Sequence, residues 1–175
     1  IAYDAITVGK LPSGTIIQVK QTTKTDTFTT NSTSYTDITG MSVSITPTSS
    51  SNKILFYYDL SVGGGNGADV NHVYIQMVRG STAINIGDSR GSRTRSTHVI
   101  NNGKAGQMFH PSACILDSPS TTSATTYKLQ MKSSTSSEVG CINRSGRDSD
   151  NAQHDGNASS TITVMEVVAW YMKLY

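Results

Sequence analysis

Glutamate is almost absent from this chain: only Glu138 and Glu166 occur in 175 residues, and charged residues of all kinds make up 15%. Long helices are built largely from Ala, Leu, Glu, Lys and Gln, so this composition argues against a helical protein. What the chain has instead is 48 Ser and Thr residues, many of them alternating with apolar side chains. β-Branched residues in a period of two are typical of strands with one buried and one solvated face. The sequence therefore predicts an all-β protein.

Long apolar runs and a strong net charge are also lacking. No stretch approaches the ~20 apolar residues that span a bilayer, and we find no signal peptide, so we expect no membrane insertion. The formal charge of +2 is too small to indicate a nucleic-acid partner. A length of 175 residues fits one domain. Because the chain starts at Ile1 and not at Met, we expect it to be the end of a longer or processed protein.

Cysteine is scarce, with Cys114 and Cys141 alone. Each lies in a segment with strand-like alternation, and two buried thiols are the simpler interpretation. A bridge between neighbouring strands stays open, because the sequence does not give the distance between the two residues.

Short strands separated by Gly, Pro, Asn and Ser fill most of the chain. The strongest is 53–62, in which alternate residues are apolar and share one face. The other expected strands are 14–22, 25–30, 33–38, 41–45, 72–79, 83–86, 108–116, 127–131, 138–143 and 160–170. Two polar stretches, 88–106 and 145–158, lose the alternation and predict long loops. About nine or ten strands with negligible helix predict an antiparallel, jelly-roll-like β-sandwich.

The first and last strands are apolar on both faces. Val164 belongs to one face of the last strand, and Met165 and Val167 belong to the other. Since the terminal strands of a jelly roll can lie side by side, we expect other subunits to cover their shared outer face; a local cover by 1–11 or 171–175 is the alternative. Glu166 is expected at a rim or beside a polar partner, because burying a lone carboxylate is costly. The expected interface residues are Ile16, Ile17, Val19, Tyr57, Val164, Met165, Val167 and Trp170.

Several segments resemble, in the same order, a group of bacteriophage virion proteins. The segments are 14–21 (GTIIQVKQ), 25–28 (TDTF), 41–47 (MSVSITP), 79–84 (RGSTAI), 116–119 (LDSP), 125–130 (TTYKLQ), 143–150 (NRSGRDSD) and 160–167 (STITVMEV). The group comprises tail-fibre and other structural proteins of phages that infect marine bacteria and cyanobacteria. The resemblance implies a homotrimeric β-sandwich head over 14–175, joined through a linker or shaft connection at 1–13, in a virion assembled in the host cytoplasm. It implies no catalytic, cofactor-binding or metal-binding residue.

Two loops hold the residues expected to contact a host surface. Arg90, Arg93 and Arg95, with Arg79 and Lys104 nearby, form the one basic cluster of the sequence and could attract an anionic glycan. A solvated loop with scattered arginines is the simpler interpretation. The expected host or glycan contacts are Arg90, Arg93, Arg95, Arg144, Arg147, Asp148 and Asp150.

Motifs for metal binding and catalysis fit poorly. A calcium loop beginning at Asp148 needs Gly and an acidic residue where the chain has Gln153 and Ser159. A glycosidase needs two placed carboxylates, and nearly all the aspartates here lie at turns or loop edges. We therefore expect neither an enzyme nor a cofactor, and an enzyme that cuts surface polysaccharide is a distant third hypothesis.

The sequence favours a trimeric fibre tip or receptor-binding module, in which three weak contacts with host surface groups are multiplied by tethering. The alternative is a capsid-decorating or collar protein that binds only other virion proteins. Both hypotheses place the chain in the virion.

Overall fold

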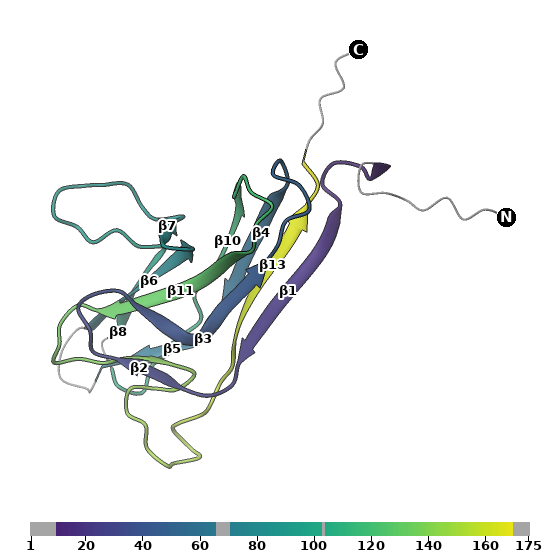
Figure 1. The fold of residues 1–175 in the computed structure, drawn as a ribbon. Helices are drawn as coiled ribbons and strands as arrows, with labels where there is room; N and C mark the ends of the chain where they lie inside the picture. The colour runs from purple at the N-terminus through teal and green to yellow at the C-terminus, as the bar shows by residue number, and fades with distance from the viewer. Residues whose placement is uncertain (1–9, 66–70, 103, 170–175) are drawn as a thin grey trace.

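The computed structural model of the chain describes residues 10–65, 71–102 and 104–169, and this part contains thirteen strands and no α-helix (Figure 1). It also contains no helix long and apolar enough to cross a membrane. The strands are β1 (Ile16–Lys24), β2 (Phe28–Thr30), β3 (Thr36–Ile45), β4 (Lys53–Asp59), β5 (Val62–Gly64), β6 (Asn71–Arg79), β7 (Thr82–Ile84), β8 (His98–Asn102), β9 (Met108–Phe109), β10 (Ser112–Asp117), β11 (Thr125–Ser133), β12 (Gly140–Ile142) and β13 (Ser160–Val167).

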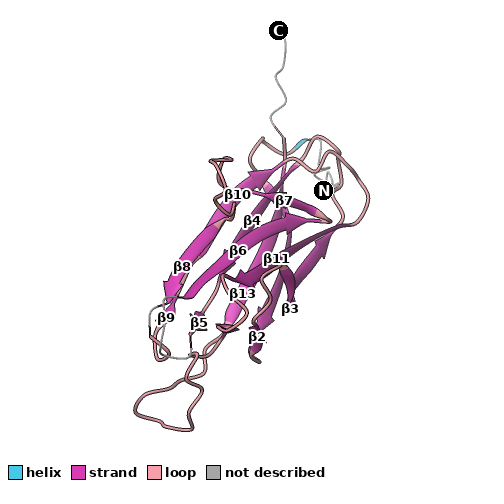
Figure 2. Cartoon of the chain, turned by 90° about the vertical axis from the view of Figure 1, so that its left-hand side faces the viewer, coloured by secondary structure: helices cyan, strands magenta, loops and turns pink. Residues whose placement is uncertain are grey.

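The eight longer strands lie in two antiparallel sheets: a four-stranded one, β1-β13-β4-β10, and a five-stranded one that contains β3-β11-β6-β8 (Figures 1 and 2). β7 shares the outer edge of β6 with β8. Among these eight strands in chain order, the first pairs with the last (β1 with β13), the second with the seventh, the third with the sixth and the fourth with the fifth. This is one long antiparallel ribbon wound into two layers, which defines a jelly roll. The predicted all-β sandwich is confirmed, and so is the pairing of the two terminal strands.

The core lies between the two sheets and is filled from both. Ile54, Phe56 and Tyr58 of β4 are 0% exposed, as the period-two pattern predicted. The rings of Phe56 and Tyr127 meet edge to face with centroids 5.2 Å apart. A polar link also joins the layers: Tyr127 donates a 2.7 Å hydrogen bond to Asp117, which accepts a 2.8 Å ion pair from Arg79. Asp117 ends β10 in one sheet, while Tyr127 and Arg79 face each other in the other.

Several expected boundaries differ from the structure. The expected loop 88–106 contains β8, whose five residues pair with β6 although their own sequence shows little alternation. The expected strand 108–116 is broken into β9 and β10 on either side of His110 and Pro111, because proline has no N–H to give to a ladder. Two expected strands, 33–38 and 41–45, are joined in the single strand β3, which begins at Thr36 and continues through Gly40 at a φ of 82°.

The two ends of the sandwich carry different parts of the chain. At one end lies a small third sheet, β2-β12-β5-β9, with the long loop between β12 and β13 beyond it (Figures 1 and 2). At the opposite end the described chain enters and leaves: Gly14 N–H donates to Val168 O at 3.0 Å, and Ser13 Oγ donates to Ala169 O at 3.0 Å. Most of the expected linker 1–13 lies outside the described residues.

Glu166 is 0% exposed and sits on the inner face of β13. Its Oε1 accepts hydrogen bonds from Thr48 N–H at 2.7 Å, Thr48 Oγ1 at 2.8 Å and Asn52 Nδ2 at 2.7 Å. The expectation of a polar partner for this carboxylate is therefore confirmed. The turn between β3 and β4 supplies all three donors and is held against β13 by them.

Glu166→Ala should lower the free energy of unfolding by about 3 kcal/mol, because the buried amide of Asn52 and the backbone and hydroxyl donors of Thr48 lose their acceptor. Urea unfolding of the two proteins measures this difference. Thr161→Ala, on the outer face of the same strand, is the control and should change stability by less than about 1 kcal/mol. Equal effects of the two substitutions would mean that the Glu166 hydrogen bonds do not stabilise the fold.

Candidate functional site

The β12–β13 loop, residues 143–159, projects from the end of the sandwich, and its base is closed by buried polar contacts (Figure 1). The Asn143 side chain donates to Lys24 O at 2.9 Å and Asp26 O at 2.8 Å, and it accepts from Ser160 Oγ at 2.6 Å. Asn143 has a φ of 65°, a conformation that asparagine adopts more readily than most residues. The loop therefore leaves the sheet from a fixed point.

Glycines let the loop pass close to the third sheet. A Cβ on Gly63 of β5 would collide with the backbone of Arg144 and Ser145, and one on Gly146 would collide with the backbone of Gly64 and Gly65. Glycine is the one residue without a Cβ, so both positions require it. These contacts fix where the first turn of the loop lies.

Asp155 organises the loop from within. Its carboxylate accepts from Arg147 Nε at 2.9 Å, Arg147 Nη2 at 3.1 Å and Ser145 Oγ at 2.6 Å, and also from the backbone and hydroxyl of Ser149. Its side chain is 8% exposed. The Arg147 guanidinium, followed by the Ser145 and Ser149 hydroxyls, holds the pKa of Asp155 well below its usual range. Asp155 was not among the expected contact residues, and the structure gives it a structural role.

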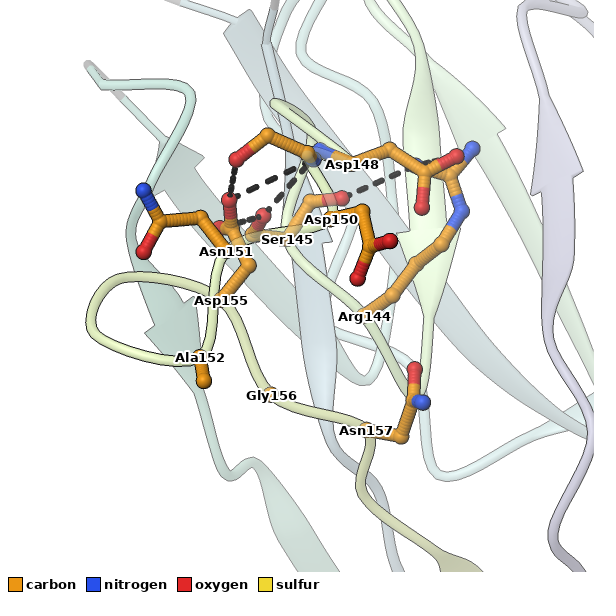
Figure 3. Close-up of a pocket in the computed structure, with 10 residues that line it drawn as sticks. Arg144, Ser145, Asp148, Asp150, Asn151, Ala152, Asp155, Gly156 and Asn157 are labelled. Atoms are coloured by element: carbon orange, nitrogen blue, oxygen red, sulfur yellow. Dashed lines mark hydrogen bonds and ion pairs between the residues drawn. The ribbon is translucent and has the colours of Figure 1, made fainter.

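A hollow of about 310 Å³ opens on the loop surface beside this network (Figure 3). Arg144, Asp148, Asp150, Asn151 and Asn157 are among its lining residues. Arg144 ion-pairs with Asp148 at 3.2 Å and donates to Thr29, so its guanidinium is held in place. The side chains of Asp150 and Asn157 make no hydrogen bond within the described residues, which leaves their oxygens and the Asn157 amide available to a ligand. Three of the expected contact residues, Arg144, Asp148 and Asp150, are thus brought together.

The arginine loop between β7 and β8 lies elsewhere on the molecule (Figures 1 and 2). Arg90, Arg93 and Arg95 are exposed there, and Arg95 donates to Gly87 O at 2.6 Å. Arg79 does not join them, because it is paired with Asp117 between the sheets. The structure therefore divides the expected contact residues into two separate surfaces.

No group of three or more potential metal ligands among His, Cys, Asp and Glu occurs in the described part of the chain. The two thiols are free and lie in different sheets: Cys141 is buried in the third sheet, but Cys114 is exposed on the outer face of β10. The expectation of two buried thiols is therefore wrong for Cys114, whose side chain points away from the core.

The outer face of the β1-β13-β4-β10 sheet carries an exposed apolar row, which we call the outer row. Cross-strand pairing places Val19, Met165, Leu55 and Leu116 side by side across all four strands. Val19 is 55% exposed and Leu116 is 53% exposed. The neighbouring rows add Ile16, at 48%, and Tyr57, at 36%. An apolar surface of this extent on one sheet is typical of a site that contacts another macromolecule.

The expected interface residues can now be placed. Ile16, Val19, Tyr57, Met165 and Val167 share this outer face, and Ile17 lies at the β-bulge between Ile16 and Gln18. Val164 needs correction: it is 0% exposed in the core, because it alternates with Met165 and Val167. Trp170 lies outside the described residues.

Leu55, Cys114 and Leu116 complete the face but were not expected in the interface. The alternation of Leu55 with Phe56 places it on the same face as Tyr57 from the sequence alone, whereas placing Leu116 and Cys114 required knowledge of which strands pair.

Comparison with known proteins gives little further guidance. No family model matches the chain, and no curated protein does. Among solved structures, one of the infectious bursal disease virus Gx strain shares 14% identity at a TM-score of 0.43, covering 89% of this chain and 43% of that one. A D431N mutant VP2 protein of the same virus, from T=1 particles, shares 14% identity at a TM-score of 0.44, covering 99% and 45%. The chain thus spans less than half the length of these proteins, and likeness at this level assigns neither family nor function.

The pKa of Asp155 should stay low enough for its carboxylate to remain ionised at pH 4, near the ordinary aspartate value of about 3.9. Since this pKa is lowered in the fold, the contribution of Asp155 to stability is present above the ordinary aspartate range and is lost as the pH falls through the lowered pKa. Carbon NMR of the side-chain carboxyl groups measures the titration. Arg147→Met should move the midpoint upward, and an unchanged midpoint would contradict the assigned cause.

Gly63→Ala should destabilise the protein by about 2 kcal/mol, because the new methyl group must displace the backbone at Arg144. Gly87→Ala is the matched control, since a Cβ there meets nothing within 4 Å. Thermal unfolding compares the two, and amide NMR shifts report whether 144–157 moves. Equal stability of the two variants would show that β5 and the loop do not pack closely.

Proposed function

We propose that the chain is a structural protein of a virus particle and that its sandwich is a fibre head that adheres to the host surface through the β12–β13 loop. The resemblance of eight ordered segments to phage virion proteins supports the first part. A jelly roll alone would not, because this fold hosts many functions. The observation that carries the second part is that the described chain enters and leaves at one end of the sandwich, whereas the loop lies at the other. An attachment at the chain ends would point the loop outward.

The hollow on the loop suits a hydroxyl-rich ligand better than a strongly anionic one. Among its lining residues, Arg144 contributes one positive charge and Asp148, Asp150 and Asp155 contribute three negative ones, so 1 − 3 gives a net charge of −2. The carboxylate of Asp150 accepts hydrogen bonds, while the amide of Asn157 both donates and accepts. Neighbouring hydroxyls of a neutral sugar offer the matching groups. A small, open hollow with no aromatic lining residue makes each contact weak.

Adhesion would then depend on several copies acting together. When several weak sites are linked on one particle, binding of the first raises the effective concentration of the others at the surface. The overall avidity then exceeds the affinity of a single site, although each site makes the same contacts. The resemblance implies three copies per head, and the adhesion proposal requires more than one.

The test is binding of the purified protein to an array of neutral and of sulfated or uronic-acid oligosaccharides. Asp150→Ala combined with Asn157→Ala should weaken binding to neutral glycans about tenfold, because about two hydrogen bonds are lost. Arg90→Ala combined with Arg93→Ala is the control on the other loop and should leave this binding unchanged. If the protein binds anionic glycans and only the arginine variant loses this binding, the glycan site lies on the β7–β8 loop and not on the β12–β13 loop.

The alternative is a decorating or collar protein that binds other virion proteins, and the outer row favours it. An exposed apolar sheet face suits protein contacts, whereas the polar loop would then have no ligand. Absence of glycan binding in every arm of the array, together with binding of the protein to purified virus particles, would support this alternative.

A further inference from the structure

The outer face of the β1-β13-β4-β10 sheet is a grid of four rows across four strands. The outer row is the second. The first row contains Ile16, Val167 and Lys53, with Ser118 bonded to Lys53 Nζ at 2.6 Å. The third row contains Gln21, Thr163, Tyr57 and Cys114, and the fourth contains Thr23, Thr161, Asp59 and Ser112.

Only two of these side chains carry a charge, and they stand at opposite ends of β4. Lys53 lies in the first row and Asp59 in the fourth, with Leu55 and Tyr57 between them. Along β4 the face therefore reads positive, apolar, aromatic, negative. If a second copy of this face is laid on the first with its β4 running in the opposite direction, Asp59 of one copy lies over Lys53 of the other. Tyr57 of one copy then lies over Leu55 of the other.

We infer that this face pairs with the same face of a second copy of the chain, about a two-fold axis that crosses the strands between the second and third rows. Such an axis stacks each strand on its own counterpart, running in the opposite direction. Lys53 of one copy then meets Asp59 of the other, and Leu55 meets Tyr57. The same operation places Val19 over Gln21, Met165 over Thr163 and Leu116 over Cys114. A contact of this kind is isologous, so each complementary pair occurs twice.

The self-complementary charges indicate a copy of this chain as the partner rather than an unrelated protein. The pairing does not depend on the adhesion role of the β12–β13 loop, which lies at the end of the sandwich and not on this face. It also differs from the threefold arrangement that the sequence resemblance implies, since a two-fold contact holds chains in pairs.

The size of the face sets the expected strength. Four strands about 4.8 Å apart and four rows about 6.8 Å apart cover about 520 Å² per copy, or about 1,000 Å² in total. Stable complexes bury about 1,200–2,000 Å². We therefore expect a weak pair that dissociates on dilution, and that is strengthened where copies are held together on a particle.

Charge reversal tests the pairing on the full chain by sedimentation equilibrium over a concentration series. The wild type should shift from the 18.7 kDa single chain to a species of two chains. Asp59→Lys replaces both attractive contacts by repulsive ones and should raise the dissociation constant about tenfold. Lys53→Asp combined with Asp59→Lys restores opposite charges across the axis and should recover the wild-type constant. Asp88→Lys, an exposed aspartate on the β7–β8 loop, is the control and should have no effect.

Cys114 provides a second readout that does not depend on charge. It lies in the third row, next to the axis, whereas Cys141 is 0% exposed. A short bis-maleimide should join two wild-type chains through Cys114, and Cys114→Ser should abolish the product. A single-chain species at every concentration would overturn the inference, and so would a species of three chains or a failure of the double reversal to recover the dissociation constant. If Cys114 of a single-chain species did not react with the maleimide, another part of the same chain would cover the face, and this result would also overturn the inference.

Discussion

The register of β13 between β1 and β4 is the constraint on which both faces of this sheet depend. Side chains alternate along a strand, so Val164 and Glu166 point into the core while Met165 and Val167 point outward. A slip of one residue would exchange the two sets. Glu166 opposes such a slip, because its buried oxygen accepts three hydrogen bonds from one turn, 48–52, that an apolar side chain could not accept. A single carboxylate thus helps to decide which side chains the surface presents.

The sequence was informative wherever a strand follows the period of two over its own length. The alternate residues of 53–62 that share the inner face, Ile54, Phe56, Tyr58, Leu60 and Val62, are fully buried. The apolar second face of the terminal strands does lie on the outside of a sheet. The polar loop at 145–158 was also identified, because alternation and apolar residues are both missing there. The polar partners of Glu166 were predicted from the cost of burying a lone charge. These features are local, so a short window of sequence contains the whole signal.

What could not be predicted depends on pairing between distant segments. β8 is a strand because β6 offers it an edge, not because of its own pattern. The outer row requires that Leu116 be placed beside Leu55, and only the strand order does this. Among the loop residues, Asp155 resembled its aspartate neighbours in sequence; its role follows from Arg147, Ser145 and Ser149 converging on it. The arginines are likewise divided between two surfaces because the fold places the β7–β8 loop and the β12–β13 loop at different positions on the sandwich.

β13 also joins the two candidate surfaces without coupling them. Its first residue, Ser160, bonds to Asn143 at the base of the loop, and its later residues Met165 and Val167 lie on the outer face of the sheet. Asn143 is itself held by the carbonyls of Lys24 and Asp26, so the base of the loop is fixed by bonds that do not involve residues 148–157. Under the two proposals, a substitution could therefore change the ligand of the loop and leave the pairing face unchanged, since the two surfaces share a strand but no side chain.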